Sequence, residues 1–238
     1  MKNLSGTGIS KSFKGRMVVK NISIKIDQGE IVGLLGPNGA GKTTTFLMML
    51  GIHKPETGRI MMDDRDITQE PVYIRARLGI SFLPQEPSIF KGLTVKDNIR
   101  AVMDMCPTDT HRDIDEVLEE MGLSGLWQRK AVLLSGGERR RLEIARSLIL
   151  SPYFLLLDEP FAGIDPIQIR EIQRLVKIFK DKGLGIIITD HNVRETLKIT
   201  DRSYIINRGE VIFQGTSQEL IENERVKNEY LGKEFRWN

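Results

Sequence analysis

Residues 31–44 read IVGLLGPNGAGKTT, a continuous apolar run that leads into a glycine-rich loop. An apolar run without alternating polar residues is typical of a strand buried on both faces. The loop fits G-x-x-x-x-G-K-[ST], in which the glycines let backbone N–H groups turn inward around a phosphate chain. A helix expected from Lys42 onward would add its positive N-terminal end. The alternative is a glycine-rich turn with an incidental lysine, and the position between a buried strand and a helix argues against it.

This loop predicts a bound nucleotide and a metal ion. Lys42 should reach the β- and γ-phosphates, and the hydroxyl of Thr43 should bind Mg²⁺. The expected cofactors are therefore ATP and Mg²⁺. The residues that we assign to nucleotide binding in the loop are Gly36, Pro37, Asn38, Gly39, Ala40, Gly41, Lys42, Thr43 and Thr44.

Other apolar patterns place this loop in a parallel sheet. Residues 154–157 (FLLL) and 185–189 (GIIIT) are again continuous apolar runs. Between them, residues 172–179 keep the i, i+3, i+4, i+7 apolar spacing of an amphipathic helix. Buried strands that alternate with helices predict a parallel sheet covered by helices. Residues 22–26 alternate as in a half-buried strand, and residues 204–213 predict a β-hairpin around Asn207–Glu210.

Residues 86–133 follow a different pattern, because apolar residues 114–121 repeat at helical spacing and no buried-strand run appears. We interpret this stretch as a helical insertion. The expected fold is α/β, a P-loop NTPase (RecA-like) parallel sheet with an antiparallel β edge and an inserted α-helical subdomain. Residues 1–238 form one domain in this interpretation, with the nucleotide-binding core at 1–85 and 146–238 and the helical subdomain at 86–145.

Two acids end the second buried strand, at Asp158 and Glu159. Successive strand side chains point to opposite faces, so the two carboxylates should have different roles. Asp158 suits the Mg²⁺ shell, as in the Walker-B position. Glu159 can then orient the attacking water or accept its proton. The alternative is that these acids only cap the next helix, and the phosphate loop upstream argues against it.

A histidine follows the third buried strand, at Asp190-His191. The carboxyl ends of the strands are where α/β sheets bind ligands, so His191 could donate a hydrogen bond to the γ-phosphate. A lone histidine is more often structural than catalytic. His53 and His111 have no comparable context, and we interpret them as surface or packing residues.

A second glycine-containing motif, LSGGE at residues 134–138, precedes a predicted helix. Ser135, Gly136 and Gly137 would lie at the helix N-terminus and form a second anion site. One nucleotide rarely needs two such sites from one chain. The arginine run at 139–141 could be a nucleic-acid patch, but we favour the solvated face of this helix.

The LSGGE segment with its helix resembles the signature motif of ABC-type ATPases. The resemblance extends along nearly the whole chain, since Gln85 matches the Q-loop, Asp165 the D-loop and His191 the switch histidine. It implies that the signature of one subunit closes over ATP held by another, in a homodimer. It also implies catalytic roles for Gln85, Glu159 and His191, and metal contacts from Thr43, Gln85 and Asp158. Phe13 stands where the family places an aromatic ring under the adenine, usually tyrosine; a buried strand-end phenylalanine is the alternative.

Within this family, three stretches resemble the lipopolysaccharide-export ATPase: residues 83–90, 158–166 and 189–197. The resemblance implies extraction of lipopolysaccharide from the inner membrane for transport to the outer membrane, by a subunit that pairs with two transmembrane permeases. The tail at 226–232 is shared with ATPases of branched-chain amino-acid importers. An importer ATPase, or an ABC ATPase without a membrane role, as in iron–sulfur cluster assembly or DNA repair, therefore remains an alternative.

Composition agrees with a partner-dependent membrane role. No apolar run approaches the roughly 20 residues of a spanning helix, so other chains must cross the bilayer. We expect a cytoplasmic protein, peripheral on the inner membrane through its permeases, which would dock near Gln85–Phe90. Phe90 is the expected anchor, and its burial in the helical subdomain is the alternative. A net charge of +3 is too weak to predict nucleic acid as a partner. The single cysteine, Cys106, permits no internal disulfide.

Overall fold

The computed structural model describes residues 1–106 and 111–232, and the end of the expected domain at 233–238 lies outside that range. Its central sheet has six strands in the order β10-β9-β3-β8-β7-β6. Four neighbouring pairs are parallel, and only β9 and β10 form an antiparallel hairpin at one edge. The predicted parallel sheet with an antiparallel edge is thus confirmed. The strands are β3 Ile31–Leu35, β6 Ile80–Leu83, β7 Phe154–Asp158, β8 Gly185–Thr189, β9 Arg202–Asn207 and β10 Glu210–Gly215.

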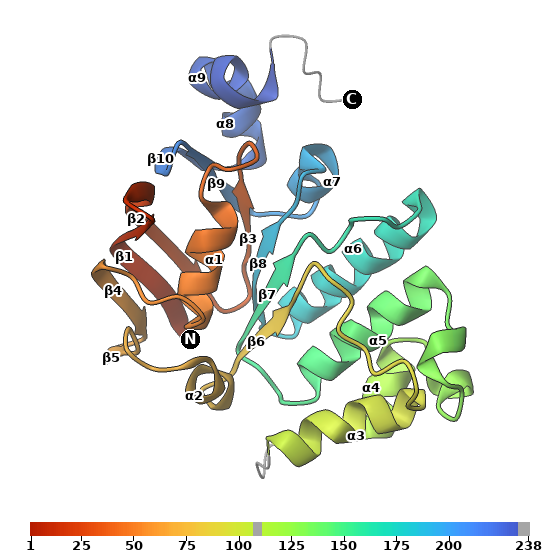
Figure 1. The fold of residues 1–238 in the computed structure, drawn as a ribbon. Helices are drawn as coiled ribbons and strands as arrows, with labels where there is room; N and C mark the ends of the chain where they lie inside the picture. Colours follow the sequence, from red (N-terminus) through yellow and green to blue (C-terminus); the bar gives the residue numbers. More distant parts are fainter. Residues whose placement is uncertain (107–110, 233–238) are drawn as a thin grey trace.

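A second, antiparallel sheet has the order β2-β1-β4-β5. Its strands are β1 Asn3–Phe13, β2 Arg16–Asp27, β4 Thr57–Met62 and β5 Arg65–Asp66. The helix α1 Lys42–Leu50 packs between the two sheets, because its buried residues share one hydrophobic cluster with both (Figure 1). That packing fixes the direction in which the start of α1 points.

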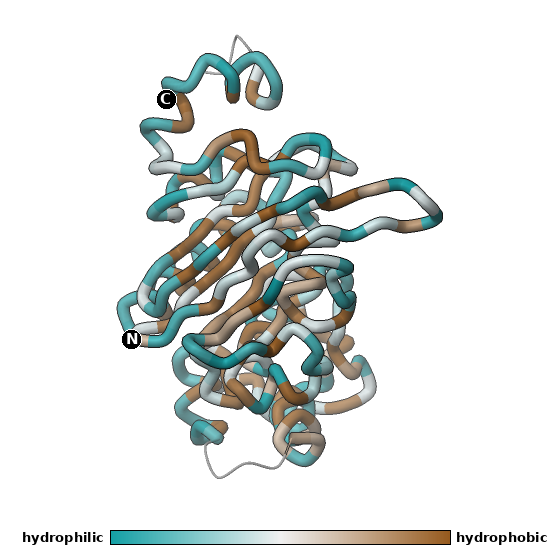
Figure 2. The backbone as a smooth tube through the Cα atoms, turned by 90° about the vertical axis from the view of Figure 1, so that its left-hand side faces the viewer, coloured by the Kyte–Doolittle hydropathy of each residue, from teal (hydrophilic) through white to brown (hydrophobic). Residues whose placement is uncertain are grey.

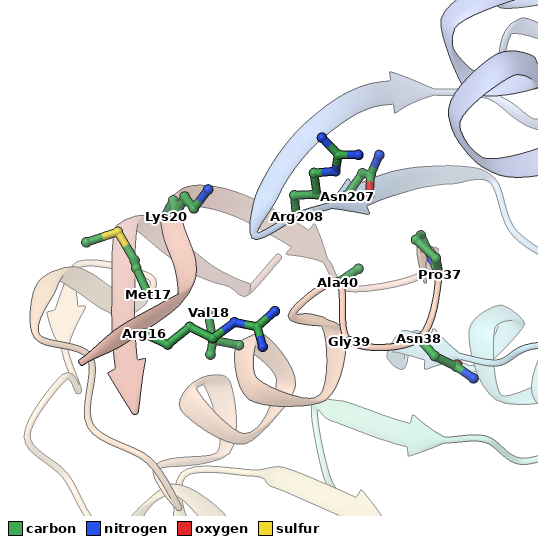
Figure 3. A pocket seen from close by; sticks show the side chains of 10 residues that line it. All are labelled: Arg16, Met17, Val18, Lys20, Pro37, Asn38, Gly39, Ala40, Asn207 and Arg208. Carbon is green, nitrogen blue, oxygen red and sulfur yellow. The ribbon is translucent and has the colours of Figure 1, made fainter. Parts of the chain in front are cut away.

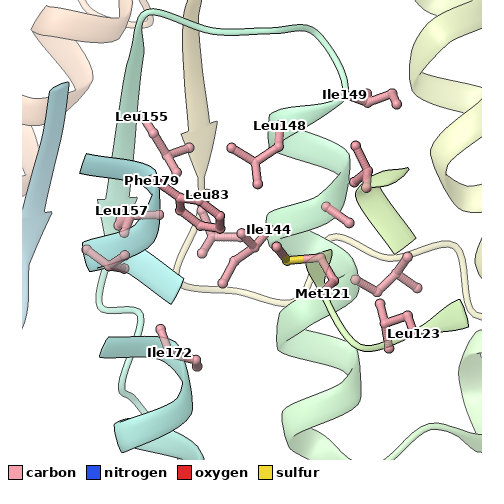
Figure 4. Close-up of a cluster of buried hydrophobic side chains, with 14 of the residues drawn as sticks. Leu83, Met121, Leu123, Ile144, Leu148, Ile149, Leu155, Leu157, Ile172 and Phe179 are labelled. Atoms are coloured by element: carbon pink, nitrogen blue, oxygen red, sulfur yellow. The ribbon is translucent and has the colours of Figure 1, made fainter. Parts of the chain in front are cut away.

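The helical subdomain lies beside the edge strand β6. It contains α3 Val95–Met105, α4 Ile114–Glu120 and α5 Gly136–Leu148, with short turns at Ser124–Leu126 and Ala131–Leu133. The expected boundary at 145/146 lies inside α5, which continues to Leu148. Leu142, Ile144 and Leu148 of α5 pack with β7 and with α6 Pro166–Asp181 in one continuous cluster (Figure 4). The signature helix is therefore anchored directly against the nucleotide-binding core.

The remaining helices are α2 Val72–Arg77, α7 Val193–Leu197, α8 Ser217–Glu222 and α9 Glu224–Val226, with a final turn at Lys227–Leu231. Figure 2 looks onto the antiparallel sheet, where hydrophobic and hydrophilic residues are interspersed along the strands. No helix in the described part of the chain combines the length and apolarity that crossing a membrane requires.

Candidate functional site

The phosphate loop (residues 36–44) joins β3 to α1, and its glycines are required by close backbone approach. Gly36 has a φ of 150°, and a Cβ there would lie 2.0 Å from the carbonyl oxygen of Ile206. Gly41, with a φ of 106°, begins α1 without any side-chain cap. The first N–H groups of a helix have no partner within the helix, so an uncapped start leaves them available to an anion.

Lys42 is hydrogen-bonded to the backbone of the loop that precedes it. Its Nζ donates hydrogen bonds to the carbonyl oxygens of Gly36, at 2.7 Å, and Pro37, at 3.0 Å. Burial lowers the pKa of Lys42, and the nearby carboxylates of Glu159 and Asp158 oppose that shift. A phosphate should attract this ammonium more strongly than two neutral carbonyls do, because opposite charges attract each other.

Two cavities adjoin the loop. A cavity of about 150 Å³ lies between the loop and the strand ends; its lining includes Lys42, Thr43, Asp158 and Glu159. A larger cavity of about 620 Å³ opens on the other side, between the loop, β2 and the β9–β10 hairpin (Figure 3). Three basic side chains line it, from Arg16, Lys20 and Arg208. The first cavity has the position of a terminal phosphate and the second has room for the rest of a nucleotide.

The three residues assigned to catalysis meet at one carboxylate. The side-chain amide of Gln85 donates a hydrogen bond to Oε2 of Glu159 at 2.8 Å. Nδ1 of His191 lies 3.3 Å from the same oxygen. Glu159 itself has a φ of 45°, in the left-handed region, directly after β7. The geometry brings together a carboxylate for the water and two groups that can sense the nucleotide.

Asp158 is almost fully buried beside this group, with 7% of its surface exposed. Burial raises the pKa of its carboxyl, and a hydrogen bond from Thr189 opposes the rise. Thr43, Gln85 and Asp158 offer oxygen donors of the kind that Mg²⁺ prefers. Residues 1–106 and 111–232 hold no cluster of three or more His, Cys, Asp or Glu side chains for a metal. A single carboxylate with a hydroxyl therefore fits Mg²⁺, which is usually bound by one or two carboxylates plus substrate phosphates and water.

The arginine run after the signature differs from the sequence interpretation. Arg140 is 7% exposed and lies inside the site, so the prediction of a solvated face is wrong there. Its guanidinium donates to the carbonyl oxygens of Pro84, at 3.1 Å, Asp158, at 3.3 Å, and Glu159, at 3.2 Å. It also pairs with Glu143 at 2.9 Å. The i, i+3 spacing of Arg140 and Glu143 was the available signal that this arginine could be neutralised and buried.

The signature segment (residues 134–138) lies apart from these groups. Ser135 caps α5 with a complete capping box, since its Oγ accepts from the N–H of Glu138 at 3.3 Å and its own N–H donates to Oε2 of Glu138 at 2.6 Å. At Gly137 a Cβ would lie 1.7 Å from Oε1 of Gln168, so a side chain at this position would require Gln168 of α6 to move. Ser135, Gly136 and Gly137 are absent from the linings of both cavities beside the phosphate loop.

Phe13 also lies outside those linings. It ends β1 with 40% of its surface exposed, so it is not a buried core residue. Its ring packs edge-on against the ring of His53, with centroids 5.3 Å apart. Asp165, the D-loop residue, caps α6 by accepting from the N–H groups of Ile167 and Gln168.

Known proteins resemble this chain over most of its length. The ABC transporter family model matches residues 19–162. The lipopolysaccharide export system ATP-binding protein LptB of Escherichia coli strain K12 is 49% identical over 240 residues, covering 99% of this chain and 100% of that protein. A probable ABC transporter ATP-binding protein of Azorhizobium caulinodans is 51% identical over 237 residues, covering 98% of this chain and 84% of that protein.

Among solved structures, a nucleotide-free ATP-binding cassette from an ABC transporter superposes with a TM-score of 0.88 at 28% identity, covering 98% of this chain and 100% of that one. The fold, the phosphate loop and the paired acids thus coincide with a family match over more than half of the chain. The chain belongs to the ABC transporter family, as an ATP-binding subunit whose ATPase activity is coupled to transport.

Proposed function

We propose that this chain hydrolyses ATP to power lipopolysaccharide extraction from the inner membrane and its export toward the outer membrane. The observation that carries the proposal is the likeness to the E. coli lipopolysaccharide export protein, at 49% identity over 99% of this chain and 100% of that protein. The motifs of the site account for ATP hydrolysis. The likeness to the export protein is what indicates lipopolysaccharide as the transported molecule.

The proposed reaction uses a composite site made by two copies of the chain. The phosphate loop of one copy would hold ATP, Thr43 and Asp158 would hold Mg²⁺ with Gln85, and Glu159 would orient the attacking water. When bound, the metal neutralises charge on the phosphates. Ser135, Gly136 and Gly137 of the other copy then contact the γ-phosphate. None of these three residues lines either cavity beside the phosphate loop of its own chain, which supports a contact made between two copies.

The proposed permease contact is an apolar surface that follows Gln85. Phe90 is 42% exposed and is therefore not folded into the subdomain core. The guanidinium of Arg146 lies 4.8 Å from its ring centroid and steadies it. Leu93, Val132 and Leu133 are also exposed, and backbone hydrogen bonds join their two segments, including Val132 N–H to Lys91 at 3.1 Å. Clustered exposed apolar residues mark interaction sites, which favours docking here.

The proposed location follows from this contact: the chain lies on the cytoplasmic face of the inner membrane and is attached through its permeases. Family members pair with such subunits, which supports the assignment. The partners themselves would be identified by purifying the tagged chain from its own cells in detergent. The same purification with Phe90→Ala should retain ATP binding and lose most of the permease.

The cargo is tested with that purified complex in phospholipid vesicles. ATPase activity should rise severalfold when lipopolysaccharide is included in the vesicles, and should not respond to branched-chain amino acids with a solute-binding protein. The opposite pattern would assign the chain to an importer. If the active chain co-purified with no membrane protein, the transport role would be wrong.

A further inference from the structure

The end of β8 carries a threonine that none of the site's motifs includes. Thr189 lies beside Asp158 in the parallel register of β8 and β7, at the carboxyl end of both strands. It is 1% exposed and lines the small cavity with Lys42 and Asp158. A buried hydroxyl needs hydrogen-bond partners to offset the loss of water, so its contacts identify what it holds in place.

Thr189 contacts both acidic residues at the end of β7, Asp158 and Glu159. The Thr189 hydroxyl donates to Oδ1 of Asp158. The backbone N–H of Glu159 donates to the Thr189 carbonyl oxygen at 2.8 Å and lies 3.4 Å from its Oγ1. A hydroxyl has one proton to donate and can accept two, so a single Oγ1 can serve both neighbours. One threonine is therefore connected to the metal-binding acid and to the backbone of the catalytic one.

The backbone contact matters because Glu159 is strained. Its φ of 45° lies in the left-handed region. Non-glycine residues in such regions cost on the order of 1–3 kcal/mol and persist only where the surroundings hold them. Here the bond from its N–H to Thr189 fixes the turn that swings the Glu159 side chain toward Gln85 and His191.

The hydroxyl of Thr189 bonds to one of the two carboxylate oxygens of Asp158. That oxygen is Oδ1. Within residues 1–106 and 111–232, the other oxygen of Asp158, Oδ2, forms no side-chain hydrogen bond. The hydroxyl thereby fixes the rotation of the carboxylate group, with one oxygen held by the protein and the other available to a ligand from the phosphate-loop side. Groups that orient a metal ligand in this way typically contribute about 10–100-fold to metal affinity or activity.

We infer that Thr189, through its hydroxyl, is a positioning residue for the Mg²⁺ ligand Asp158. The inference rests on the Mg²⁺ site of the proposed function. It assigns Thr189 no contact with nucleotide or water. Its effect passes through Asp158, so its loss should weaken the metal more than the nucleotide.

The test uses binding and does not depend on turnover. A fluorescent, non-hydrolysable ATP analogue is titrated with the purified full chain in EDTA and at increasing Mg²⁺. Thr189→Val replaces the hydroxyl with a methyl group of similar size, and Thr189→Ser keeps the hydroxyl. Thr196→Val removes a buried hydroxyl of α7 that donates to the carbonyl oxygen of Asn192.

Thr189→Val should raise the Mg²⁺ concentration at half-effect by about 10–100-fold, with affinity in EDTA unchanged. Thr189→Ser and Thr196→Val should behave as the wild type. If Thr189→Val is poorly folded, Thr189→Ala gives the same comparison without the added methyl groups.

Equal Mg²⁺ dependence in the wild type and the hydroxyl-free variant would overturn the inference. So would an equal loss of affinity for the analogue in EDTA, or a Thr189→Ser variant that fails to restore the wild-type Mg²⁺ dependence. A wild type that binds the analogue without any response to Mg²⁺ would instead overturn the metal site of the proposed function.

Discussion

The phosphate loop and the signature segment each place glycines at the start of a helix, yet the two helix starts are built differently. The helix α1 begins at Gly41 with no side-chain cap. The helix α5 begins at Ser135 with a complete capping box. An uncapped start leaves its N–H groups for a ligand, whereas a capping box satisfies two of them internally. This difference supports the proposal that the first region holds the phosphates and that the second completes a site formed with another copy.

The surroundings of the two helix starts differ in the same way. Lys42, Asp158, Glu159 and Thr189 all line the cavity at the start of α1. Ser135 and Gly136 are exposed and lie in neither cavity beside the loop. Chemistry is therefore concentrated at one helix start, and the other supplies only backbone and a hydroxyl. The following variants, from the largest expected effect to the smallest, test that division.

Glu159→Gln should have the largest effect, since it keeps the shape of the side chain and removes the base. General acid–base groups contribute about 10²–10⁴-fold in rate, so turnover should fall by that amount. ATP binding should persist, because Lys42 and the loop are unchanged, and a stable dimer should appear in gel filtration with ATP. A variant that hydrolyses ATP at a substantial rate and stays monomeric would contradict the role of Glu159.

Lys42→Ala and Ser135→Arg should each reduce activity, but less than Glu159→Gln does, because they act at opposite ends of one composite site and leave the base in place. Lys42→Ala removes the charge that meets the phosphates, so nucleotide affinity of the single chain should fall as well. Ser135→Arg should leave single-chain affinity unchanged. In a mixed dimer of the two variants, both lesions share one site and the other site is intact, so residual hydrolysis should return.

Crosslinking provides the control for that experiment. Cysteines placed at Asn38 and Gly136 should crosslink between chains when ATP is present, on a chain with Cys106 replaced. Crosslinks formed only within one chain would show that the signature closes over its own phosphate loop. The proposed site made by two chains would then be wrong.

The sequence predicts the first of these regions better than the second, for a physical reason. Continuous apolar runs predict β3, β7 and β8, and the short motifs at their ends locate Lys42, Asp158 and His191 without knowledge of distant contacts. The sheet order brings those ends together, as expected for parallel strands.

Long-range contacts explain what the sequence does not predict. Only residues 22–26 indicated the antiparallel sheet, because β1 is rich in Gly, Ser and Thr and its burial is irregular. The burial of Arg140 depends on carbonyl oxygens of Pro84 and Asp158, and that of Thr189 on Asp158. No local periodicity records such contacts.

Gly137→Ala should have an intermediate effect, on packing alone. Its Cβ would overlap Oε1 and Cδ of Gln168, at 1.7 and 2.3 Å. Overpacking of this kind costs about 1–3 kcal/mol, which should appear in thermal melting of the single chain. Gln168→Ala removes the overlapping atoms, so the double variant should regain most of the lost stability. Gly136→Ala is the matched control, because no atom lies within 4 Å of a Cβ at that position.

The last set of variants, at Ser135, should have the smallest effects on stability. They separate the role of Ser135 as a helix cap from its role as a phosphate contact. Ser135→Ala removes the cap and should cost about 1 kcal/mol of stability, a melting shift of roughly 2–4 °C in a chain of this size. Asn and Asp cap helices as well as Ser does, so Ser135→Asn and Ser135→Asp should both melt near the wild type. Only Asp places a negative charge where the γ-phosphate of the other copy must arrive, and like charges repel there. ATPase activity should therefore fall well below that of the Asn variant, with single-chain ATP affinity equal in both. If Asn and Asp were equally active, Ser135 would be a cap and nothing more, and the two helix starts would differ in structure without dividing the work of one site.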